Sequence, residues 1–163
     1  MKLKKSRIIG FMLSVFVIVV TIFSAFIGHK KNYSTLDNDC SAAVSIRDKS
    51  ANFSARLNIY LSLHNDNTGY LDVVGKISEA GVSYTTARSW RFNYALQNGN
   101  TAYLTRLTMD KRAADDSPDG LVDRLIFSTD AGSGRYVKIA VLNNAWVIGN
   151  LYSPQFLCLI RDK

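Results

Sequence analysis

Residues 53–63 of the 163-residue chain read Phe-Ser-Ala-Arg-Leu-Asn-Ile-Tyr-Leu-Ser-Leu. Apolar side chains take every second position from Phe53 to Leu63, and polar or amphipathic side chains take the positions between them. Successive side chains of a β-strand point to opposite faces, so a period of two places the whole apolar set on one face. The stretch therefore predicts a long, half-buried strand.

Further stretches of the chain alternate in the same way, and polar turn sequences separate them. Strands are predicted at residues 70–77, 82–96, 102–109, 136–142 and 145–151, with a last one around 156–158. Turn signals lie between them, at residues 65–69, 79–81, 97–100 and 143–144. The pair Asn98-Gly99 is typical of a tight hairpin, because such turns need a left-handed backbone. Short turns without helical crossovers predict antiparallel pairing.

One short helix is predicted, near residues 118–127. Ser117 is expected to cap its N-terminus, Pro118 suits the first helical position, and Asp119 suits the positive end of the helix dipole. Apolar residues then recur at helical spacing. With about seven or eight strands, the predicted fold is mainly β: an antiparallel barrel-like or strongly curved sheet with one short helix.

The net charge of +7 is concentrated at the N-terminus. Residues 1–31 hold six of the 20 Lys and Arg residues and no acidic residue. Residues 32–163 therefore carry a net charge of only +1, and they contain no basic run interleaved with aromatic residues. This distribution argues against nucleic-acid binding. The apolar and aromatic content excludes intrinsic disorder, and two cysteines are too few for a disulfide-dense scaffold.

The uncharged stretch from Ile8 to Ile27 predicts a transmembrane helix. Twenty residues at ~1.5 Å rise cover about 30 Å, the thickness of a bilayer's hydrocarbon core. A cleaved signal peptide is the alternative, but its apolar core is shorter, and bulky Phe26 stands where small residues are needed. The excess of Lys and Arg before the span places the N-terminus in the cytoplasm. The predicted parts are a cytoplasmic tail (1–7), a transmembrane helix (8–28), a stalk (29–39) and an exported β domain (40–163).

The two cysteines lie near the two ends of the exported part. Cys40 follows the predicted anchor closely, and Cys158 lies five residues before the C-terminus. An oxidising compartment would allow them to pair, and the bridge would join both ends of the domain. Two separate buried thiols are the alternative.

The sequence offers little material for catalysis. The only histidines are His29, next to the predicted membrane span, and His64, at a strand end beside a turn. No Gly-x-Ser-x-Gly motif is present to hold a nucleophilic serine. The acidic cluster at residues 115–119 lacks the alternating ligands and closing Glu of a calcium loop. We therefore predict no catalytic residue, no metal site and no cofactor.

An aromatic set on one face of the predicted strand 82–96 is the candidate binding surface. Its aromatic members are Tyr84, Trp90, Phe92 and Tyr94, and Arg88 shares their face. These residues form either a packed barrel core or the lining of an apolar ligand cavity or partner surface. An inward-pointing arginine needs an acidic partner, an anionic ligand or a position at a cavity mouth.

Three motifs together resemble the FidL-like membrane proteins of enterobacteria. They are Leu-Asp-Val-Val-Gly-Lys-Ile at 71–77, Arg-Ser-Trp-Arg-Phe-Asn-Tyr at 88–94 and Ser-Pro-Gln-Phe-Leu-Cys at 153–158. The second contains the family's Arg-x-x-x-Phe-x-Tyr strand, and the third contains its terminal Pro-x-Phe-x-Cys. A Pro-Asp step before a Leu-rich segment is matched at 118–121. The resemblance extends over nearly the whole chain.

The resemblance implies a small inner-membrane accessory protein with a periplasmic β domain. FidL-like proteins are expected to accompany membrane-anchored, ToxR-like transcriptional regulators, much as ToxS-type effectors do. The implied role is non-enzymatic: the domain would bind a regulator and stabilise or modulate it. One alternative is a stand-alone small barrel for a lipophilic ligand such as a bile salt or lipid. Another is an anchored enzyme with a polar cleft around His64.

Overall fold

The computed structural model describes residues 36–97, 99–126 and 134–161. They lie in a compact unit that spans Thr35–Lys163. The predicted cytoplasmic tail (1–7) and transmembrane helix (8–28), and stalk residues 29–35, lie outside the described residues. Within the described ranges, no helix has the length and apolar character needed to cross a membrane.

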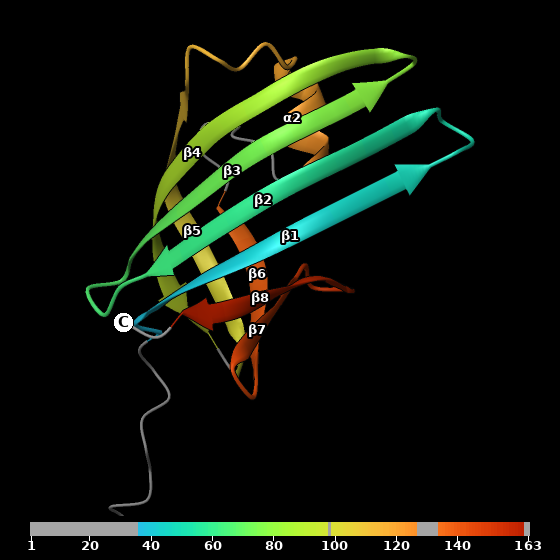
Figure 1. Cartoon of the computed structure of the whole chain (residues 1–163). Coiled ribbons are helices and arrows are strands. Elements are labelled where there is room, and N and C mark those ends of the chain that lie inside the picture. Colours follow the sequence, from blue (N-terminus) through green and yellow to red (C-terminus); the bar gives the residue numbers. More distant parts are fainter. Residues whose placement is uncertain (1–35, 98, 127–133, 162–163) are drawn as a thin grey trace, which may run out of the picture. The chain divides into compact units, whose positions relative to one another are not determined.

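Eight antiparallel strands follow one another around a closed barrel (Figure 1), as the alternation of the sequence predicts. A single helix, α2 (Asp119–Leu125), stands between β5 and β6 within the described residues. The strands are β1 Asn38–Asp48, β2 Phe53–Leu63, β3 Thr68–Glu79, β4 Val82–Leu96, β5 Thr101–Lys111, β6 Arg135–Leu142, β7 Ala145–Gly149 and β8 Pro154–Arg161.

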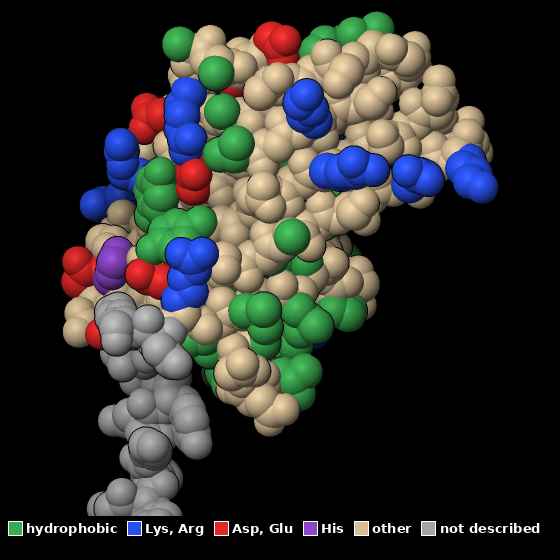
Figure 2. All heavy atoms as spheres, in the orientation of Figure 1, with side chains coloured by type: hydrophobic (Ala, Val, Ile, Leu, Met, Phe, Trp, Pro, Cys, Tyr) green, Lys and Arg blue, Asp and Glu red, His purple; other side chains and the backbone are tan. Residues whose placement is uncertain are grey.

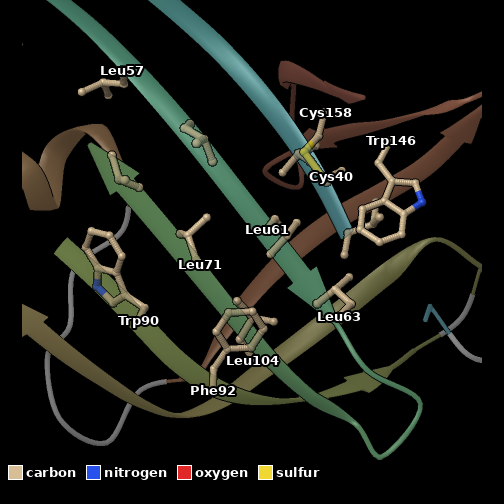
Figure 3. Packing of buried hydrophobic residues seen from close by; sticks show 14 of the residues in the cluster. Cys40, Leu57, Leu61, Leu63, Leu71, Trp90, Phe92, Leu104, Trp146 and Cys158 are labelled. Atoms are coloured by element: carbon tan, nitrogen blue, oxygen red, sulfur yellow. A yellow bond between two sulfur atoms is a disulfide. The ribbon is translucent and has the colours of Figure 1, made fainter. Parts of the chain in front are cut away.

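The inward-facing side chains of the strands form a hydrophobic core inside the barrel (Figure 3). Along β2, the positions from Ala55 to Leu63 that face inward are all buried, whereas Arg56 and Asn58 between them are exposed. Trp90 of β4 and Trp146 of β7 are the largest fully buried side chains among the described residues, and Figure 3 shows them well apart in the core. The period of two therefore produces one exposed and one buried face around Arg56 and Asn58, whereas outward-facing Ser62 near the end of the strand is buried as well.

The hairpins use the turn residues that their backbones require. Ala80 and Gly81 join β3 to β4 in two residues, and their φ angles are +52° and +86°. Two positive φ angles give a turn whose twist matches that of the flanking strands. Asn143, with a φ of +53°, serves the same purpose between β6 and β7. These tight turns set the register of the neighbouring strands.

The first strand is absent from the sequence-based prediction, which begins the sheet at Phe53. In the structure β1 pairs with β2 along its full length, from Asn38↔Leu63 to Asp48↔Phe53. Its inward positions include Cys40 and Val44, and the small side chains around them weaken the alternation. Residues 42–48, more than half of its length, have no second neighbouring strand among the described residues, so burial provides little selection for bulky apolar residues there.

The helix begins and ends close to the predicted bounds, but the expected cap is wrong. Pro118 is the N-cap residue, and no side chain caps the helix. The hydroxyl of Ser117 instead donates to Asp115 Oδ1 at 2.6 Å, and this serine is fully buried. Ser117 therefore belongs to a polar cluster that fixes the segment before the helix.

The barrel closes through a very short junction between β1 and β8. Only three residue pairs join them, from Asp39↔Arg161 to Ser41↔Leu159. The disulfide Cys40–Cys158 lies beside these pairs, with a Cα–Cα distance of 5.4 Å, and both sulfurs belong to fully buried residues (Figure 3). The structure thus has the predicted bridge, and the bridge joins the first strand to the last.

Loss of the disulfide should destabilise the closed barrel. We expect Cys40→Ala/Cys158→Ala to lower the free energy of unfolding by about 2–5 kcal/mol, because the unfolded chain regains the freedom of a long loop. Urea denaturation of residues 36–163, with and without a reductant, measures this loss. The reductant should destabilise the wild type and leave the double variant unchanged. Equal stability of the two proteins without reductant would contradict the expectation.

Candidate functional site

The interior of the barrel contains an open apolar cavity of about 450 Å³. Inward-facing side chains from β1 to β8 and from α2 line it, and polar groups are few. The apolar lining includes Val44, Ile46, Leu57, Ile59, Leu61, Leu63, Leu71, Phe92, Leu104, Leu125, Ile126, Val137, Ile139, Ile148 and Phe156. Arg135 and exposed Ser45, Tyr136, Asn150 and Gln155 also border the cavity, which places its mouth among β1, β6, β7 and β8.

The mouth exists because β1 and β8 separate beyond their short junction. Within the described part of the chain, residues 42–48 of β1 pair only with β2, and residues 154–158 of β8 pair only with β7. Figure 1 shows the long β1–β2 hairpin extending away from the short β6–β8 sheet, and Figure 2 shows an indentation between them. We call this gap the seam. It leaves one edge of β1 with unpaired backbone groups beside an apolar cavity.

The helix α2 borders the same cavity. Leu121 and Val122 are buried in the core, and Leu125 and Ile126 line the cavity. The segment before the helix runs along β4, where the N–H of Asp116 donates to the carbonyl of Thr85 at 3.1 Å. The position of α2, and hence the shape of the cavity, depends on how this segment is held.

A buried ion pair holds the segment in place. Arg88 is fully buried, and its Nε lies 2.9 Å from Asp115 Oδ2. Its Nη2 donates to the carbonyl of Ser117 at 2.7 Å, and its Nη1 lies 2.8 Å from Asp119 Oδ1. Arg88 thus connects β4 to both the loop and the first residue of α2. The inward arginine meets an acidic side chain of its own chain.

The carboxylate of Asp115 is strongly stabilised in its ionised form. Burial opposes its ionisation, but hydrogen bonds from Arg88, from Ser117 and from the N–H of Ala87 outweigh this effect and hold the pKa of Asp115 well below its ordinary value. The Ala87 N–H lies 2.8 Å from Oδ2. Ionised Asp115 therefore compensates the charge of Arg88, as a buried pair requires.

Asp39, Ser62 and His64 meet elsewhere on the barrel. Ser62 Oγ donates to Asp39 Oδ1 at 2.6 Å and lies 3.3 Å from His64 Nε2. In a nucleophilic triad the histidine stands between the serine and the acid and removes the serine proton. Here the serine stands in the middle and directs its proton to the carboxylate. Among the described residues, no group of three His, Cys, Asp or Glu side chains is placed to hold a metal ion.

Comparison with models of known protein families finds a match for this chain. Residues 75–158 match the family model described as FidL-like putative membrane protein. The chain belongs to the FidL-like family. The matched region contains Arg88, Asp115, helix α2 and the second cysteine, so it includes the ion pair that positions the helix. A search of curated proteins finds no match.

In this FidL-like protein the predicted aromatic face divides between core and cavity. Phe92 lines the cavity, whereas Trp90 is fully buried outside its lining. The Tyr94 hydroxyl lies 2.7 Å from the carbonyl oxygen of His64, and burial raises its pKa. Tyr84 is half-buried and packs against the core. Arg88 lies in the ion-pair cluster rather than at the cavity.

Most of the cavity lining was not among the residues predicted from the sequence. Val44 and Ile46 come from the unrecognised strand β1, and Leu125 and Ile126 come from the end of the short helix. Their signal is present in the sequence, since Cys40, Val44 and Ile46 share the even-numbered positions of an alternating stretch. That alternation marks an inward face, but it does not reveal an empty space behind that face.

Replacement of Asp115 should destabilise the protein in a pH-dependent manner. We expect Asp115→Asn to cost roughly 3 kcal/mol at pH 7, because Arg88 then stays buried with only Asp119 as its counter-ion. The pKa of Asp115 is lower in the folded than in the unfolded chain. The contribution of this carboxylate to the free energy of unfolding is therefore complete above roughly pH 4, and it declines as the pH falls further. Urea denaturation from pH 7 to pH 3 measures the free energy of unfolding of wild type and Asp115→Asn. The difference between the two should become smaller as the pH falls.

Asp123→Asn is the matched control, because Asp123 also lies on α2 but outside the ion-pair cluster. It should change stability by less than about 0.5 kcal/mol. If the difference in the free energy of unfolding between wild type and Asp115→Asn increased as the pH falls, the stabilising role of ionised Asp115 would be contradicted.

Proposed function

We propose that the chain is a non-enzymatic, single-pass membrane accessory protein whose periplasmic domain binds a membrane-anchored, ToxR-like transcriptional regulator. Binding would stabilise or modulate that regulator. The observation that carries the proposal is the seam: an apolar cavity opens beside an unpaired strand edge. Such a surface is suited to association with another polypeptide.

Both parts of the seam favour a protein occupant. The unpaired N–H and C=O groups of β1 can accept an additional strand, a common mode of peptide recognition. The apolar side chains behind that edge, including Val44 and half-exposed Ile46, lose contact with water when a strand covers them. One occupant would satisfy the strand edge and fill the cavity.

Membrane anchoring would strengthen this association. The basic flanks around residues 8–28 support one span with a cytoplasmic N-terminus, and the family description supports a membrane location. Two proteins held in one membrane meet at a high effective concentration, so an interface of modest size is sufficient.

The polar clusters of the barrel support a binding role rather than a catalytic one. Arg88 and Asp115 neutralise each other inside the barrel, and Ser62 directs its proton to Asp39. The cavity itself is lined mainly by aliphatic side chains. Such a lining suits the exclusion of water. Its described members include Arg135 and Tyr136 but no His, Cys, Asp or Glu, the side chains that acid–base chemistry uses most often.

Co-purification with a candidate membrane-anchored, ToxR-like regulator tests the proposal. The full chain should retain that regulator's periplasmic domain. Deletion of the gene for the FidL-like chain should shorten the regulator's lifetime in a protease chase. We expect Val44→Lys/Ile46→Lys to weaken retention at least tenfold, because the charges enter the cavity mouth. Val82→Lys, at a half-exposed hairpin position, is the control. Absence of a complex, or retention unaffected by the seam variant, would contradict the proposal.

A stand-alone lipophilic-ligand barrel is the second candidate. The cavity volume of about 450 Å³ favours it, since ligand pockets typically measure roughly 300–1,000 Å³. A bile salt or a lipid chain would then occupy the cavity, whose lining includes Phe92 and Leu104.

Displacement of a fluorescent apolar probe tests this candidate on residues 36–163. N-phenyl-1-naphthylamine should become bright on binding, a bile salt below its micelle concentration should displace it, and Leu104→Trp should reduce binding at least tenfold by filling the cavity. Val82→Trp serves as the control. A wild-type protein that leaves the probe dark, or a Leu104→Trp variant that binds it normally, would contradict the ligand hypothesis.

A further inference from the structure

A row of basic side chains crosses the outer face of the barrel at the far end of the β1–β2 hairpin. Arg47 of β1, Arg56 of β2 and Lys76 of β3 are exposed and occupy outward-facing positions of three adjacent strands. Figure 2 shows blue side chains following this hairpin. We call these three residues the basic row.

The basic row has no acidic counterpart in the part of the chain that the structure describes. Among the described residues, no carboxylate lies within ion-pair distance of its members, whereas four other arginines of the barrel have acidic partners: Arg88, Arg91, Arg112 and Arg124. Asp48, which follows Arg47, accepts hydrogen bonds from Ser50 in its own turn.

The register makes this arrangement costly. Arg56 stands directly opposite Lys76 in the β2–β3 ladder, and Arg47 is opposite Ser54, one diagonal step from Arg56. Like charges at directly opposed positions destabilise a sheet, and diagonal neighbours lie only about 7–8 Å apart. An anion bound beside the row would remove this repulsion.

The basic row borders the seam. Arg47 lies within the part of β1 that pairs only with β2, so its free edge faces the gap. On the inner face of the same stretch, Val44 and Ile46 line the cavity. The edge therefore presents cations outward and apolar side chains inward, at alternating positions of one strand.

We infer that the partner segment received at the seam is an extended acidic strand, with Asp or Glu at its outward positions and apolar residues at its inward positions. This inference rests on the proposed docking at the seam and adds the chemistry of the occupant. A strand added beside β1 lies about 4.8 Å from it, so its outward carboxylates lie next to Arg47, with Arg56 one strand further on. The inward residues enter the cavity next to Val44.

An anionic membrane surface offers negative charge as well, but it matches fewer of these features. A lipid surface has no backbone to pair with the free edge of β1, and it does not supply alternating apolar side chains. The combination of strand edge, apolar inner face and basic outer face is complementary to a polypeptide strand. Such charge complementarity contributes to partner choice and makes binding sensitive to salt.

Binding of synthetic peptides to the full chain tests the inference. The chain is placed in phosphatidylcholine nanodiscs, and three ten-residue fluorescent peptides are titrated: alternating Glu-Val, alternating Lys-Val and alternating Ser-Val. We expect Glu-Val to bind at least tenfold more tightly than Lys-Val, with Ser-Val between them. The preference should weaken as salt rises from 50 to 500 mM.

Charge-reversal variants test whether the basic row causes the preference for the acidic peptide. Arg47→Glu/Arg56→Glu should reverse the preference, so that Lys-Val binds more tightly than Glu-Val. Arg106→Glu/Lys138→Glu makes the same change in net charge at exposed positions outside the basic row and should leave the preference intact. Circular dichroism of both variants verifies that the barrel is folded.

The possible failures are distinguishable. Equal binding of all three peptides would overturn the acidic preference and leave docking at the seam standing. Equal loss in both double variants would overturn the assignment to the basic row. Binding of phosphatidylglycerol vesicles through the row, without selective peptide binding, would identify a membrane contact instead. If no peptide binds, the inference is overturned. The co-purification experiment with the regulator then tests the proposed function independently.

Discussion

The short β1–β8 junction is the constraint on which the rest of the structure depends. Three residue pairs and one buried disulfide close a barrel whose other strand pairs are mostly longer. Because β1 has 11 residues and only its first part meets β8, the remainder projects with a free edge. Closure at one end and separation at the other produce both the cavity and its mouth. The disulfide thus stabilises a barrel that is closed and yet accessible.

The ion pair between Arg88 and Asp115 is the second interaction that shapes the cavity. Arg88 ties β4 to Asp115, Ser117 and the start of α2, and α2 places Leu125 and Ile126 against the open space. A buried charge pair of this kind is costly to break, because either partner alone remains desolvated. The helix therefore stays in place without a long apolar face of its own. Covalent closure and a buried ion pair together define the shape of the site.

Much of this architecture could be predicted from the alternation and the turn residues, as the regular pattern of β2 and the two-residue turn at Ala80 illustrate. The pairing of Cys40 with Cys158 and the need of Arg88 for a counter-charge could also be predicted. The seam could not, because it depends on how far β1 and β8 remain paired, which is a property of barrel closure. Asp115 was not identified as the partner of Arg88, since 26 residues separate them along the chain.

Hydrogen exchange at the backbone amides of β1 tests the central claim most directly. In the full chain alone, amides of residues 42–48 that face the seam should exchange much faster than those paired with β2. Addition of the regulator's periplasmic domain should slow exchange at these seam-facing amides and leave the outer hairpin at Ala80 unchanged. Binding that slows exchange elsewhere on the barrel, with residues 42–48 still exchanging freely, would contradict the account.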